Sequence, residues 1–182
     1  DKTLPGIQGT GFTRMIGRRD KAAHERAIRA EGFADYAITP PGERAQYSSI
    51  VYIEPFTGRN LKAFGYDMFA EPVRGLAMAR ARDSGEPALT GRVTLVQEDE
   101  QNAQPGFLMY VPVYRKDQPT ASVEQRRAAL LGFTYSPFRA HDLLHSQERP
   151  DVQASGSTRE QVRDLLERVD LALSDDSDTS KG

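Results

Sequence analysis

The sequence predicts an α+β fold in which helices pack on one face of an antiparallel sheet. Two observations lead to this class: three strand patterns follow one another in the second half of the chain, and a strand, a helix and a longer helix precede them. Strands and helices in this order are typical of α+β domains. A sheet with helices on one face leaves a cavity between the two layers, which suits a small ligand better than a macromolecule.

The chain begins with a predicted strand and a predicted surface helix. Residues 11–16 alternate enough in polarity to form the strand. Residues 18–31 are rich in alanine and charge and end at Gly32, so we expect a short helix with a glycine stop. Residues 33–39 follow as an extended segment, which two prolines close.

A second strand and a longer helix come next. Residues 47–54 contain four consecutive β-forming side chains, and Pro55 ends the pattern. Residues 71–83 are predicted to be helical, because Pro72 is tolerated in a first turn and Gly85 closes the far end.

The second half of the chain contains the three strand patterns. They cover residues 88–97, 106–114 and 127–135, and we expect them to pair antiparallel. The gap at residues 98–105 is a polar hairpin loop, and the gap at residues 115–126 is long enough to include a short helix.

The C-terminal part returns to helical patterns. Residues 137–147 have helical character, and residues 157–173 form an amphipathic pattern that begins with a capping serine, Ser157. We therefore expect a folded core over residues 1–147. Residues 148–182 are expected to form a linker, this amphipathic helix and a disordered tail.

The composition excludes several classes of protein. The 182-residue chain has no cysteine, so it has no disulfide, thiolate metal site or cysteine nucleophile. Its formal net charge of -2, with both signs interspersed, attracts neither nucleic acid nor an anionic membrane. Its apolar runs are far too short for a membrane-spanning helix, and it contains no Walker sequence or nucleophile elbow. We expect no secretory signal within these residues. We expect no nucleic-acid partner and no cofactor.

One pair of histidines offers an alternative, a small metal-dependent hydrolase. His141 and His145 lie one helical turn apart, the spacing by which metalloprotease helices hold zinc. Such enzymes use a glutamate beside the first histidine as general base, but this chain has Asp142 there, and a third ligand has to come from elsewhere. Two solvated histidines near the end of a short helix are the more frequent outcome of this spacing. We expect no metal site and no catalytic residue.

Aromatic and polar side chains gather on and near the predicted strands. A small-ligand pocket uses such a mixture, because apolar faces bury the ligand while a few polar groups orient it. For any single tyrosine the alternative is a core position whose hydroxyl reaches water. The cluster comprises Tyr47, Tyr52, Phe64, Tyr66, Asp67, Tyr110, Tyr114 and Tyr135.

Several short stretches, spread in order over residues 30–145, match the pattern of one known family. The stretches are residues 47–55, Asn60, Gly65-Tyr66-Asp67, Arg74, residues 81–85, Leu89-Thr90, Pro112-Val113-Tyr114 and Gly132-Phe133. Together they resemble the CHASE domain.

This resemblance implies a PAS-like fold outside the cytoplasmic membrane, between two transmembrane helices. CHASE-like domains occur in bacterial sensor histidine kinases of two-component systems, in diguanylate and adenylate cyclases, and in plant cytokinin receptors. We expect a long leading helix before Asp1, and both membrane spans, to lie outside this sequence, with residues 148–182 leading toward the second span. The chain would then be the periplasmic small-ligand sensor of a membrane-anchored homodimeric receptor, without an enzyme activity of its own.

The resemblance also implies ligand contacts. In cytokinin-binding members an aspartate hydrogen-bonds the adenine-like ring, and a leucine further along supplies backbone contacts; Asp67 and Leu89 match these positions. We expect Tyr52, Phe64 and Tyr110 to enclose the ligand. A carboxylate at the rim of a pocket can accept two N–H bonds from a heteroaromatic ligand. The alternative for Asp67 is that it stabilises the dipole of the following helix, and the identity of the ligand stays open.

Overall fold

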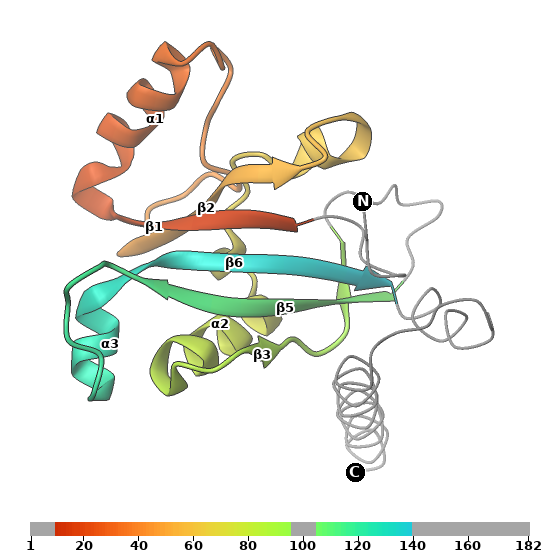
Figure 1. Ribbon diagram of the computed structural model, residues 1–182. Coiled ribbons are helices and arrows are strands. Elements are labelled where there is room, and N and C mark those ends of the chain that lie inside the picture. The colour runs from red at the N-terminus through yellow and green to blue at the C-terminus, as the bar shows by residue number, and fades with distance from the viewer. Residues whose placement is uncertain (1–9, 96–104, 140–182) are drawn as a thin grey trace. The chain divides into compact units, whose positions relative to one another are not determined.

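The computed structural model describes residues 10–95 and 105–139, within the first compact unit of the chain, Asp1–Leu143. These residues form an antiparallel sheet with helices packed against it, so the predicted α+β class is confirmed (Figure 1). The boundary predicted between residues 147 and 148 and the helix predicted over residues 157–173 lie outside the described residues.

The sheet of the described residues has the strand order β2-β1-β6-β5-β3, and β4 pairs with β5. The strands are β1 (Thr10–Gly17), β2 (Gln46–Glu54), β3 (Ala88–Leu89), β4 (Val93–Thr94), β5 (Pro105–Tyr114) and β6 (Leu130–Arg139). Every pairing is antiparallel. The first strand lies between β2 and β6 (Figure 1), so the two ends of the described chain meet in the middle of the sheet.

Three α-helices and three short 3-10 helices accompany this sheet in the described part of the chain. The α-helices are α1 (Lys21–Ala30), α2 (Pro72–Ser84) and α3 (Val123–Ala129), and the 3-10 helices are η1 (Arg18–Asp20), η2 (Gly58–Ala63) and η3 (Met68–Ala70). Figure 1 shows α2 and α3 below β5 and β6, while α1 leaves the end of β1 in another direction.

The ends of α2 follow the sequence signals. The carboxylate of Glu71 accepts hydrogen bonds from the backbone N–H groups of Val73 and Arg74, at 3.0 and 2.9 Å. Pro72 occupies the first turn, and Gly85 adopts a left-handed conformation, with φ at 81°, that ends the helix. The prediction of this helix is confirmed.

Two predictions in the second half are wrong at their boundaries. Residues 127–135 were expected to be a strand, but α3 occupies the first three of them and β6 extends further than predicted. Ser122 and Gln125 form a capping box that starts α3. This box favours a helical conformation for the arginine and alanine residues that follow it. The strand then continues through Pro137, where a helix was predicted over residues 137–147.

Two other segments are less regular than predicted. In its described part, the strand expected over residues 88–97 is divided into β3 and β4, whose registers against β5 differ by one residue. Between them the Thr90 hydroxyl accepts the Leu108 N–H at 2.9 Å. Residues 96 and 97 lie outside the described residues. Within residues 33–39, expected to be extended, residues 34–35 form a turn and Thr39 forms an isolated bridge.

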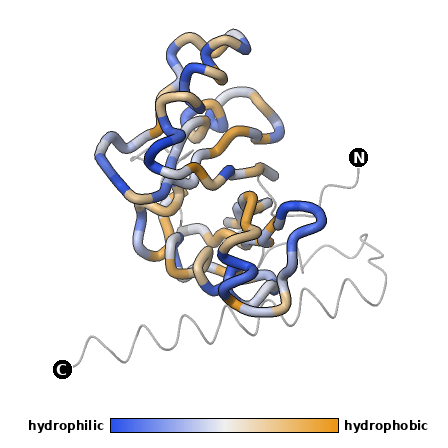
Figure 2. The backbone as a smooth tube through the Cα atoms, turned by 90° about the vertical axis from the view of Figure 1, so that its left-hand side faces the viewer, coloured by the Kyte–Doolittle hydropathy of each residue, from blue (hydrophilic) through white to orange (hydrophobic). Residues whose placement is uncertain are grey.

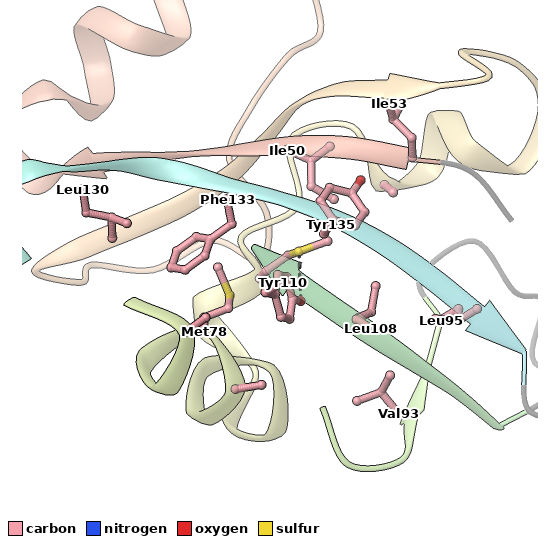
Figure 3. Packing of buried hydrophobic residues seen from close by; sticks show 14 residues of the cluster. Ile50, Ile53, Met78, Val93, Leu95, Leu108, Tyr110, Leu130, Phe133 and Tyr135 are labelled. Atoms are coloured by element: carbon pink, nitrogen blue, oxygen red, sulfur yellow. Dashed lines mark hydrogen bonds between the residues drawn. The ribbon is translucent and has the colours of Figure 1, made fainter. Parts of the chain in front are cut away.

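The main hydrophobic core lies between the sheet and α2. Figure 3 shows Tyr110 and Phe133 on the strands close to Met78 of α2. The two aromatic rings pack edge to face, with centroids 6.0 Å apart, and all three side chains are fully buried. Gly11 of β1 leaves room for the ring of Tyr135, which a Cβ at that position would strike. Aromatic burial of this kind supplies much of the stability of a domain without disulfides.

A second, smaller cluster lies on the opposite face of β1 and β2. Neighbouring strand residues point to opposite faces, so Ile16 faces this cluster while Met15 packs on the main core. Ile28 of α1 covers the cluster from outside. The buried members of this smaller cluster are Ile16, Tyr36, Ile38 and Tyr47.

In Figure 2 the hydrophobic segments of the backbone lie mainly between outer loops that are hydrophilic.

Candidate functional site

Asp67 is a fully buried carboxylate that the surrounding chain already binds. It lies immediately before η3, with an exposed fraction of 0%. Its Oδ1 accepts the backbone N–H groups of Ser48, at 2.8 Å, and of Phe69, at 3.1 Å. Its Oδ2 accepts the Nε–H of Arg44 at 2.8 Å. Asp67 therefore caps η3 and not α2, and it joins β2 to the segment that leads into α2.

Arg44 extends this network into the loop before β2. Besides Asp67, its guanidinium donates from Nη2 to the Pro40 carbonyl at 2.7 Å and lies over the Tyr47 ring at 5.0 Å from the centroid. Its side chain is 26% exposed, whereas the carboxylate it binds has no exposure. A donor from outside can reach Oδ2 most readily by taking the place of Arg44. The predicted contact between Asp67 and a ligand stays a prediction.

The other four predicted ligand residues lie in different surroundings. Tyr110 is buried in the main core, and its hydroxyl donates to the Met68 sulfur at 3.1 Å. Phe64 packs on the smaller cluster across the sheet, and Tyr52 is 55% exposed on β2. Leu89 is half-buried in β3 and offers its carbonyl to Arg80. The structure thus separates Phe64 from Tyr110 on opposite faces of the sheet, and the roles of all four stay predictions.

A pocket that the sequence did not point to opens at the end of the sheet next to α3. Its volume is 290 Å³, and it lies where β1 ends and where β2 and β6 begin. The apolar part of its wall includes Met15, Ile16 and Leu130. The polar part consists of Gln46, Arg82, Arg115 and Arg127.

Two of these arginines share one carboxylate. Asp83 accepts from Nε and Nη2 of Arg82, at 2.6 and 3.2 Å, and from Nε and Nη2 of Arg127, at 2.9 and 2.7 Å. Hydrogen bonds from Arg127, then from Arg82, hold the pKa of Asp83 well below its usual range. Asp83 therefore stays ionised and fixes both guanidinium groups at the pocket wall.

The third arginine has a different kind of partner. Nη1 of Arg115 donates to the carbonyls of Ala128 and Leu130, at 3.2 and 3.1 Å. These acceptors are neutral, so they orient the guanidinium without balancing its charge. Three guanidinium groups therefore line the pocket, and Asp83 pairs with two of them.

Sequence reasoning missed this pocket because its arginines come from separate elements. Arg82 belongs to α2, Arg115 follows β5 and Arg127 belongs to α3. The pair Arg126-Arg127 is visible in the sequence, but only the fold brings Arg82 and Arg115 beside it.

The described residues contain no group of three or more histidine, cysteine, aspartate or glutamate side chains that could hold a metal ion. His141 and His145 lie outside the described residues, so the hydrolase alternative is not tested by the geometry. Within residues 10–95 and 105–139 no helix is both long and apolar enough to cross a membrane.

Comparison with known proteins gives one match over the whole chain and one over a short segment. The family model of the CHASE domain matches residues 1–182. The cell division protein ZapA of Pseudomonas aeruginosa is 58% identical over 41 residues, which are 22% of this chain and 38% of that protein. The matched segment thus spans well under half the length of this curated relative.

Proposed function

The chain belongs to the CHASE domain family, and we propose that it is the small-ligand sensor of a transmembrane bacterial receptor with a histidine kinase or nucleotide cyclase output. CHASE domains are extracytoplasmic sensor domains of signalling receptors, bind small ligands and are themselves non-catalytic. The ligand, the output domain and the two-component context belong to the proposal.

The observation that carries the proposal is the pocket between the end of the sheet and the helices α2 and α3. A sensor needs a cavity whose walls come from elements that can shift relative to one another. This pocket is lined by β1, by the start of β2 and by both helices. A ligand bound there contacts the sheet and the helical layer together, so it favours one packing of these layers over another.

The buried Asp67 offers a second place where a ligand can act. A ligand N–H that replaces Arg44 at Oδ2 would release the loop before β2 from the sheet. In this proposal Leu89 contributes backbone contacts. Tyr52, Phe64 and Tyr110 stay proposed as aromatic ligand contacts, but Phe64 and Tyr110 pack on opposite faces of the sheet, so in this packing they do not enclose the same ligand.

The wider organisation of the receptor is part of the same proposal. Residues 1–147 would form the sensory domain on the periplasmic side of the inner membrane. Residues 148–182 would carry the signal toward a transmembrane segment. The full receptor would work as a homodimer, in which the linker of each protomer transmits the change in packing.

A thermal-shift screen of the whole chain tests the proposal. The compounds are adenine derivatives, amino acids, carboxylates and phosphorylated metabolites. A ligand at about 100 times its dissociation constant stabilises the fold by about 2.7 kcal/mol, which raises the melting temperature by several degrees. We expect at least one compound to give such a shift in a saturable manner.

A matched pair of variants tests the role of Asp67 in that screen. Asp67→Asn keeps an oxygen acceptor for the two backbone donors but removes the carboxylate charge. Asp35→Asn makes the same change at an exposed position. Loss of the ligand shift in Asp67→Asn alone supports the Asp67 contact, and a well-folded chain that responds to no compound contradicts the sensor function.

A further inference from the structure

The pocket next to α3 is lined by both apolar and cationic residues. Met15, Ile16 and Leu130 supply apolar surface, and Arg82, Arg115 and Arg127 supply guanidinium groups. A volume of 290 Å³ admits a small metabolite but not a peptide helix or a nucleic acid. The occupant therefore has a few heavy atoms, with a polar end and a short carbon part.

The arginines are held in place before any ligand arrives. Asp83 binds Arg82 and Arg127 through two hydrogen bonds each, with distances between 2.6 and 3.2 Å. The two carbonyl acceptors of Arg115 orient its guanidinium in the same way. Donors that are already oriented lose little conformational entropy on binding, which strengthens recognition of a planar or tetrahedral anion.

Arginine is the only charged residue type that lines the pocket, while the carboxylates of Asp20, next to Gly17, and of Glu124, near Arg127, lie close by. Asp83 offsets one of the three guanidinium charges, and the other polar side chain of the wall, Gln46, is neutral. Nη1 of Arg115 bonds the two carbonyls, and the guanidinium also has N–H groups at Nε and Nη2. A guanidinium fork with free N–H groups is suited to carboxylate and phosphate oxygens.

We propose that this pocket binds a small anion carrying a carboxylate or phosphate group, with Arg115 as its principal contact and with Arg82 and Arg127 adding to the positive field. This inference rests on the proposed sensor function and names the chemical class of its ligand. The anion bridges the helical layer and the sheet, because Arg82 and Arg127 belong to α2 and α3 while Gln46 begins β2.

Isothermal titration calorimetry of the whole chain tests the inference with three probes. Inorganic phosphate represents the phosphate group, succinate a dicarboxylate and citrate a tricarboxylate. Ionic strength is kept constant with sodium chloride, so a general charge effect is the same in every titration. We expect saturable binding of at least one probe, and comparison of the three separates a phosphate ligand from a carboxylate ligand.

Three variants locate the binding. Arg115→Ala removes the principal contact, and Gln46→Glu places a negative charge in the pocket without removing an arginine. Gln46 is exposed at the start of β2, so Gln46→Glu leaves the core intact. It therefore remains a valid test if Arg115→Ala disturbs the end of α3. Lys116→Ala is the control, because it removes the same charge from an exposed neighbour that does not line the pocket. We expect each pocket variant to weaken binding at least about tenfold and the control to have no effect.

The outcomes separate this inference from the function on which it rests. Binding that is unchanged in Arg115→Ala and in Gln46→Glu, or lost equally in Lys116→Ala, overturns the anion pocket. So does the absence of binding by all three probes. If a neutral or cationic compound then stabilises the chain in the thermal-shift screen, the sensor function stands without the anion pocket. If no compound of any class does so, both fail.

Discussion

Asp67 and Asp83 are both bound by arginine, but one pair is inside the protein and the other is at its surface. The Asp67 carboxylate has no exposure and is held by Arg44 and two backbone N–H groups. The Asp83 carboxylate is 28% exposed and is held by two guanidinium groups, of which Arg127 is 55% exposed. Similar distances, 2.8 Å for Arg44 and 2.7 Å for Arg127, therefore occur in two different dielectric environments.

Because of this difference in exposure, the buried pair matters mainly for stability and the exposed pair for recognition of a ligand. Removing one partner of a buried pair leaves a charge or a donor without solvation, which destabilises the fold strongly. Removing one partner of an exposed pair costs little, because water solvates the other. We infer that Asp67 and Arg44 serve mainly the architecture around β2, whereas the arginines around Asp83 remain available to an outside anion.

The largest effect is expected for Asp67→Ala. The substitution leaves the N–H groups of Ser48 and Phe69 without their acceptor, while Arg44 regains solvent because it is partly exposed. We expect the free energy of unfolding to fall by about 3 kcal/mol, the lower end of the range for a broken buried pair. Urea denaturation measures it.

Asp67→Asn is the control for this prediction, because its amide oxygen still accepts from Ser48 and Phe69. We expect it to lose clearly less stability than Asp67→Ala. Equal losses of stability in both variants would mean that the charge of Asp67, and not its backbone hydrogen bonds, stabilises the contact between β2 and η3.

A double-mutant cycle sharpens the comparison between the two pairs. The variants Arg44→Ala and Asp67→Ala, alone and together, give the coupling energy of the buried pair by urea denaturation. We expect about 1.5 to 3 kcal/mol, the range for hydrogen bonds to charged groups. The same cycle on Arg127 and Asp83 should give a clearly smaller coupling, because both groups reach solvent. Equal coupling in the two cycles would contradict the division between an architectural and an accessible pair.

The pH dependence of Asp83 gives the next smaller effect. Because the folded-state pKa of Asp83 is lowered, its contribution to stability is fully present above the unfolded-state pKa, about 3.9, and is lost as pH falls below that value. At neutral pH we expect Asp83→Asn to cost at most about 1 kcal/mol. Thermal unfolding of both proteins from neutral to acid pH should show this difference shrink below about pH 4. A difference that grows in acid would contradict the direction of the shift.

The fold was largely predictable from the sequence because its signals are local. The β-forming side chains of β2, and Pro72 and Gly85 at the ends of α2, act on their own segments whatever the rest of the chain does. The boundary between α3 and β6 was not predictable, since the stretch after Ser122 is compatible with helix and strand. Its capping box decided the outcome.

The candidate site was much less predictable, because its residues meet only in the tertiary structure. A carboxylate such as Asp67 was recognisable as a candidate, but the sequence did not show that Arg44 binds it from the loop before β2. The proposed anion pocket depends on Arg82 of α2 and on Arg115, just after β5, which come together only after β5 and α3 have packed beside α2. Periodicity and motif spacing carry no information on such contacts.

Salt should have the smallest effect and should distinguish the two carboxylates. Raising sodium chloride from about 0.1 M to about 1 M shortens the Debye length from about 10 Å to about 3 Å, which screens exposed charges far more than buried ones. We expect the stability difference between the original protein and Asp83→Asn to shrink in high salt, while the difference from Asp67→Asn stays nearly constant. Urea denaturation at both salt concentrations measures the two differences. If the Asp83 difference does not respond to salt, its guanidinium partners are not exposed to the solvent ions, and an outside anion would then have no access to them either.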